Sequence, residues 1–104
     1  MKYLANTFSP MMLGENNGAE VVPINIADLP TMAEMTSVVS HEVTAKILSA
    51  LLEENVQFNR VSLVLRTGDA LFCVIPSFRA SEAREFTHEE VAEAGFRCFQ
   101  VRVF

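Results

Sequence analysis

One short apolar run constrains the fold of this chain more than any other feature. Leu71–Ile75 reads Leu-Phe-Cys-Val-Ile, so an extended chain here is apolar on both faces. A strand with one face in water alternates polar and apolar residues, whereas a strand without alternation is covered on both sides. Gly68 and Pro76 bound the run, and both residues suit a short strand better than a helix. The sequence therefore predicts a central strand over Ala70–Phe78, with other elements covering both of its faces.

Four further segments have the residue pattern of strands, namely Lys2–Phe8, Ala19–Ile26, Arg60–Leu65 and Phe96–Phe104. The third of them is joined to the central strand by Arg66-Thr67-Gly68-Asp69. Because glycine adopts a positive φ at little cost, Gly68 predicts a tight antiparallel hairpin at this connection.

The clearest helix is expected over Val39–Glu53, with a stripe at helical spacing formed by Val43, Thr44, Ile47, Leu48 and Leu51. Either Ser37 or Ser40 is a candidate for its N-cap, and the sequence leaves the choice open. Glu42 and Lys46 are spaced for an ion pair one turn apart.

Two shorter helices are expected. Asp28–Met35 has Asp28 as a candidate N-cap and a proline in its first turn. Thr87–Ala94 opens with Thr87-His88-Glu89-Glu90, a capping box, and Gly95 follows its end. Together with the strands, these helices predict an α+β fold: a mixed sheet of about five strands with flanking helices. At 104 residues, the chain forms a single domain over 1–104.

Charge and cysteine content exclude several classes of function. The net charge of −5 argues against sequence-independent binding to DNA or RNA, although a few converging arginines can still attract a small anion. No apolar run reaches the ~18 residues of a membrane helix, and the N-terminus lacks the apolar core of a secretory signal. Cys73 and Cys98 are predicted to be buried free thiols in an intracellular, reducing compartment, with a disulfide as the less favoured alternative.

Common catalytic motifs are absent from the sequence. It contains no phosphate-binding GxxxxGK[ST] loop, no GxGxxG, no GxSxG elbow and no HExxH, so neither a metal nor a cofactor is predicted. Polar residues do occur at the ends of the apolar elements: Asn6, Ser9, His41, Asn59, Arg60, Arg79 and Glu82. Structural roles could explain them too, because His41 could bond a backbone carbonyl and Arg79 could pair locally with Glu82.

Four short motifs contain these residues in a characteristic order: Tyr3–Ser9 (Tyr-Leu-Ala-Asn-Thr-Phe-Ser), Ser40–Thr44 (Ser-His-Glu-Val-Thr), Phe58–Val61 (Phe-Asn-Arg-Val) and Arg79–Glu82 (Arg-Ala-Ser-Glu). With these motifs, the chain resembles, over nearly its whole length, the small viral ring nucleases that act as anti-CRISPR proteins against type III systems. Three positions depart from that family. Ser40 stands where Gly is usual, Ala80 where Leu is frequent, and Ala83 where Gly is frequent.

The resemblance implies a homodimer that binds cyclic tetra-adenylate, a second messenger of type III CRISPR defence, and linearises it without metal. It implies His41, Arg79 and Glu82 as catalytic residues. It also implies contacts to the ligand from Asn6, Ser9, Ser40, Asn59 and Arg60.

The chemistry of RNA agrees with these roles. A ribose 2′-OH can attack the neighbouring phosphate and leave a 2′,3′-cyclic phosphate. The enzyme then needs an acid for the leaving oxygen and positive charge for the phosphate. Histidine and arginine suit those two tasks, and a carboxylate such as Glu82 could support the histidine. The apolar loop at Met11–Leu13 could close over the ring.

Two other functions compete with this interpretation. The chain could be a non-catalytic module that sequesters the cyclic nucleotide. It could also be a structural or protein-binding viral accessory protein without any ligand. The acidic, apolar-rich composition suits the last alternative equally well.

Overall fold

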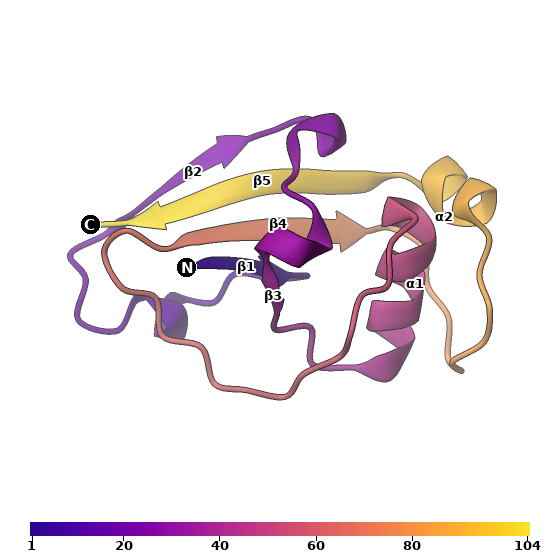
Figure 1. The fold of residues 1–104 in the computed structure, drawn as a ribbon, viewed down its shortest axis with the longest axis horizontal. Helices are drawn as coiled ribbons and strands as arrows, with labels where there is room; N and C mark the ends of the chain where they lie inside the picture. The colour runs from indigo at the N-terminus through magenta and orange to yellow at the C-terminus, as the bar shows by residue number, and fades with distance from the viewer.

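The central strand predicted from the apolar run is present as β4, Ala70–Pro76, in a computed structural model that describes residues 1–104. It lies in the middle of a five-stranded sheet with the order β2-β5-β4-β1-β3 (Figure 1). The other strands are β1 (Lys2–Ala5), β2 (Ala19–Pro23), β3 (Thr36–Ser37) and β5 (Phe96–Val103). β4 pairs in parallel with β1 and antiparallel with β5. The sheet is therefore mixed, and the predicted α+β fold is confirmed.

The two faces of the sheet have separate apolar cores, as the unalternating sequence of β4 predicts. Phe72 and Val74 point to the face covered by α1 (Glu42–Leu52) and α2 (His88–Ala94). Leu71 and Cys73 point to the opposite face, which is covered by the 3-10 helix η1 (Pro10–Leu13) and by the segment around Leu65. Since both faces are covered, every side chain from Leu71 to Val74 is buried.

The predicted strand at Arg60–Leu65 is wrong, and so is the hairpin. Gly68 does form a turn, with a φ of 97° and a hydrogen bond from Asp69 N to Arg66 O of 2.9 Å. That turn leads into β4 from an irregular segment, which runs along the lower edge of Figure 1. β1 and β5 occupy both edges of β4, so no hydrogen-bonding edge remains for a hairpin partner. The fifth strand is instead β3, which pairs with β1.

Of the two shorter helices predicted from the sequence, only the second is present. Asp28–Met35 is not one helix but parts of two 3-10 turns, η2 (Ile26–Asp28) and η3 (Met32–Glu34), with Pro30 between them. Asp28 therefore ends a turn rather than capping a helix. In α2, the predicted capping box is present, and Thr87 Oγ1 accepts a hydrogen bond from Glu90 N.

The predicted N-cap of α1 is wrong. Its N-cap is His41, and neither of the predicted serines caps it. The Ser37 hydroxyl instead donates to Gln57 O over 2.6 Å. This hydrogen bond joins the segment that precedes α1 to the segment that follows it. Lys46 pairs with Glu85 at 3.3 Å rather than with Glu42.

Both cysteines are free, as predicted, but only Cys73 is buried, whereas Cys98 is half-buried. They lie on neighbouring strands, but Cys73 is opposite Phe99 and Cys98 is opposite Val74, so the two thiols lie on different faces of the sheet. Burial raises the pKa of Cys73 to about 12, with a further contribution from Cys98, and raises the pKa of Cys98 to about 11. Neither α1 nor α2 has the length and hydropathy that a transmembrane span requires.

Candidate functional site

A polar cleft of about 540 Å³ lies where β1 and β4 end and where α1 begins. The two strands are parallel, so their carboxyl ends meet at the same edge of the sheet. Figure 1 shows α1 at the arrowhead end of β4. The chain leaving these strands and the first turns of α1 line the cleft with Asn6, Thr7, His41, Val43, Thr44, Ile47, Ile75, Pro76, Phe78, Arg79 and Ala80.

His41 is the N-cap residue of α1, and its backbone is extended, with φ −124° and ψ 138°. Its side chain is exposed and makes no hydrogen bond within the chain. A structural histidine bonded to a backbone carbonyl is therefore not what the structure shows at this position. The first N–H groups of α1 have no helical carbonyl partner, and the imidazole does not cap them. These donors remain available to an anion beside the ring.

Arg79 reaches the same cleft from the segment after β4. Its Nη1 donates weakly to Pro76 O over 3.5 Å, and its guanidinium forms no ion pair. In particular, the local pair with Glu82 that could have explained Arg79 structurally is not formed. The guanidinium is exposed, so its fork is free for an anionic ligand.

The remaining predicted residues do not line the cleft. Ser9 caps η1 by accepting from Met11 N over 3.3 Å. Arg60 donates from Nε to Ser40 O over 3.1 Å, which holds it beside the residue that precedes His41. Asn59 donates from Nδ2 to Ser37 O over 3.2 Å and so braces the entry to α1. Glu82 is exposed and has no ion pair.

Among the cleft residues that were not singled out from the sequence as ligand contacts, three have a polar or aromatic side chain, namely Thr7, Thr44 and Phe78. Thr7 and Phe78 each follow the last residue of a parallel strand by two positions. That shared offset would have indicated them, had the pairing of β1 with β4 been known. Phe78 is held edge-on against Phe86 with ring centroids 5.5 Å apart, so it offers a positioned aromatic surface to a base.

The charge of the cleft differs from that of the whole molecule. The protein carries a net charge of −5, yet the cleft is lined by an arginine and a histidine and by no carboxylate. Histidine, cysteine and carboxylate side chains do not gather in threes anywhere in a way that could hold a metal ion. With the free N–H groups of α1, the lining can bind a phosphate and place an imidazole beside it.

The Met11–Leu13 loop, for which the sequence left a role as a lid open, lies away from this lining. Met12 and Leu13 pack on the opposite face of the sheet, while Met11 is 85% exposed. Leu65 N donates to Met12 O over 2.8 Å, which joins η1 to the irregular segment. Movement of this loop over a ligand would therefore require two side chains to leave an apolar core.

Comparison with known proteins identifies relatives in viruses. The chain is 25% identical to the uncharacterized protein ORF116 of Acidianus filamentous virus 1, over 88% of this chain and 82% of the relative. It is 27% identical to the uncharacterized protein 26 of Sulfolobus islandicus filamentous virus, over 99% of this chain and 92% of the relative. Its fold is similar to that of B116 of Sulfolobus turreted icosahedral virus, with a TM-score of 0.79, 20% identity and 97% of each chain covered. The sequence model of one viral family, STIV B116-like, matches residues 2–98, and this chain belongs to that family.

Proposed function

We propose that this protein is a metal-independent ring nuclease that binds and linearises cyclic tetra-adenylate, and so switches off type III CRISPR signalling. The observation that carries the proposal is the meeting of Asn6, His41 and Arg79 in one cleft at the start of α1. These residues come from three of the four motifs that resemble the viral ring nucleases, and they are 35 and 38 residues apart in sequence (41 − 6 and 79 − 41).

In the proposed reaction, the ribose 2′-OH of one adenylate loses its proton to water as its oxygen attacks its own 3′-phosphate. The P–O5′ bond breaks, and the products are a 2′,3′-cyclic phosphate and a 5′-hydroxyl. Arg79 and the first N–H groups of α1 bind the phosphate oxygens, whose negative charge grows in the transition state. His41 donates a proton to the departing 5′-oxygen, a step that typically contributes ~10²–10⁴-fold.

The proposal includes a homodimer, because four of the five expected ligand contacts lie outside the cleft of one subunit, namely Ser9, Ser40, Asn59 and Arg60. Arg60 belongs to the irregular segment that carries Phe58, Val61 and Val64, which are 51%, 49% and 54% exposed. Met11 is exposed on η1, which is hydrogen-bonded to the same segment. Burying this apolar surface against a second copy would favour association. A two-fold axis would also present two copies of each arginine to a cyclic ligand with four phosphates.

The direct test is incubation of the purified protein with cyclic tetra-adenylate, with and without EDTA, followed by chromatography. We expect linear products with 2′,3′-cyclic phosphate and 5′-hydroxyl ends at the same rate in both samples. Substrate in tenfold excess over protein separates catalysis from sequestration, because a sequestering module would bind a stoichiometric amount and release no product. Absence of both binding and cleavage would favour a structural or protein-binding role.

A further inference from the structure

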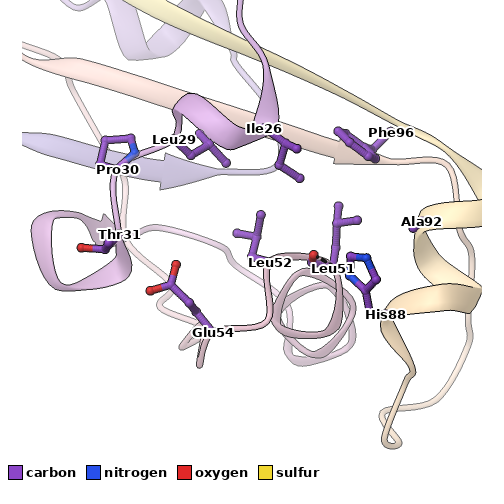
Figure 2. A pocket seen from close by; sticks show the side chains of 10 residues that line it. All are labelled: Ile26, Leu29, Pro30, Thr31, Leu51, Leu52, Glu54, His88, Ala92 and Phe96. Carbon is purple, nitrogen blue, oxygen red and sulfur yellow. Dashed lines mark hydrogen bonds between the residues drawn. The ribbon is translucent and has the colours of Figure 1, made fainter.

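A second cleft lies at the other end of α1, away from His41, and has a volume of about 370 Å³ (Figure 2). It is formed by the end of α1, by α2, by the start of β5 and by the connection from η2 to η3. Its walls are mainly apolar, and Ile26, Leu51, Leu52 and Phe96 lie around it in Figure 2. A volume of this size is near the lower end of the ~300–1,000 Å³ typical for small-molecule sites.

His88 supplies one polar group of this cleft, and its hydrogen bonds determine its tautomer. Its Nδ1 lies 3.0 Å from Leu51 O, 3.3 Å from Ala50 O and 3.3 Å from Glu53 Oε1. The two carbonyls can only accept, and so can the ionised carboxylate, so Nδ1 must carry a hydrogen. In the neutral ring, Nε2 is then an acceptor, and it has no hydrogen bond within the chain. The neutral ring therefore offers a ligand an acceptor at Nε2.

Glu54 supplies a second acceptor. One of its carboxylate oxygens accepts from Met32 N over 3.1 Å, which leaves the other without a partner in the chain. Neither lysine nor arginine lines the cleft. The carbonyl end of α1 adds partial negative charge, and Glu53 lies beside it. The surroundings of this cleft therefore disfavour an anion and favour a group that brings hydrogen-bond donors and positive charge.

We propose that this second cleft binds a small organic amine, with an apolar body against Leu52 and Phe96 and an ammonium group at the Glu54 carboxylate. The ammonium supplies a donor to the Glu54 oxygen that has no partner in the chain, and its charge complements the carboxylates and the end of α1. The site shares no lining residue with the cleft that holds His41 and Arg79. Its test is consequently independent of the nuclease activity proposed above.

Three probes with the same phenylbutyl body and different head groups test the inference: 4-phenylbutylamine, 4-phenylbutanol and 5-phenylpentanoate. Each is titrated into the ¹⁵N-labelled protein, and amide shifts are followed by NMR. The amine should cause saturable shifts centred on Leu52, Ala92 and Phe96, at least roughly twofold tighter than the alcohol. The acid should bind more weakly than the alcohol. Equal or tighter binding of the acid, shifts centred elsewhere, or no saturation by any probe would overturn the proposal.

Two variants distinguish the contribution of the Glu54 charge to binding from the contribution of the cavity volume. Glu54→Gln keeps an acceptor for Met32 N–H and removes the charge, so the amine should bind roughly two- to fivefold more weakly while the alcohol is unaffected. Glu20→Gln, at the opposite end of the sheet, is the matched control and should change neither. Ala92→Leu fills the cavity and should weaken both probes. Unchanged amine affinity in Glu54→Gln refutes the ammonium site, even if the Ala92 variant fails to fold.

Discussion

The two histidines of this chain allow the catalytic hypothesis to be tested against a structural one. His41 is exposed and makes no side-chain hydrogen bond, whereas His88 Nδ1 lies within 3.3 Å of two carbonyls at the end of α1. Replacing each histidine with alanine should therefore lower a different property of the protein. His41→Ala should affect the reaction, and His88→Ala should affect the fold.

The magnitudes follow from these contacts. His41→Ala removes no capping bond and no burial, so the free energy of unfolding should change by less than about 0.5 kcal/mol. If His41 is the general acid, the single-turnover rate should fall by at least ~10²-fold, equivalent to about 2.7 kcal/mol of activation free energy. His88→Ala removes the donor to Leu51 O and should cost about 0.5–1.5 kcal/mol. That loss corresponds to a melting temperature lower by roughly 4–8 °C per kcal/mol.

Thermal unfolding and single-turnover cleavage of cyclic tetra-adenylate should be measured on the same preparations, at a temperature where both variants are folded. Affinity for the ligand should stay within roughly an order of magnitude in His41→Ala, because the acid acts mainly in the transition state. A well-folded His41→Ala protein that cleaves as fast as wild type would show that His41 is not the acid. A lowered melting temperature with full activity in the folded fraction would make His41 structural.

Four other measurements test the site and the fold. Arg79→Ala should strongly weaken binding or cleavage, and Arg79→Lys should restore it only in part, because lysine lacks the bidentate fork; full activity of the alanine variant would remove Arg79 from the site. Light scattering should show a dimer, and Val64→Glu should shift it towards monomer if the exposed segment is the interface; a fully active wild-type monomer would contradict the dimer. At pH 8 the thiols should react with Ellman's reagent only after unfolding, because burial raises the pKa of Cys73 to about 12 and of Cys98 to about 11; rapid labelling of the native protein would contradict this. Burial alone would raise the pKa of Asp69, but a backbone N–H bond and the N-terminal ammonium hold it below its ordinary value. Its contribution to stability is therefore present at neutral pH and lost as the pH falls through that lowered pKa. Asp69→Asn should accordingly be less stable than wild type at pH 7, and the difference should shrink in acid; an equal difference at both pH values would refute the assignment.

Features set by neighbouring residues could be predicted from the sequence. The unalternating run of β4 indicated a strand covered on both faces, and the sequence Thr87–Glu90 indicated a capping box at the start of α2. The apolar stripe of α1 likewise placed that helix to within three residues at its start and one at its end. Each of these signals depends on side chains and backbone groups only a few positions apart, so no knowledge of the rest of the chain is needed.

Pairing between distant segments was decided by the tertiary structure. Arg60–Leu65 has the pattern of a strand, but β1 and β5 occupy both edges of β4, and the two-residue β3 completes the sheet instead. Asn6, His41 and Arg79 could be identified from the sequence as candidate site residues, but the sequence did not show that they line the same cleft. They meet because β1 pairs in parallel with β4, which brings both carboxyl ends to one edge, and because α1 begins at that edge. Local residue patterns do not specify which strand lies beside which, since that choice depends on the burial and hydrogen bonding of the whole sheet at once.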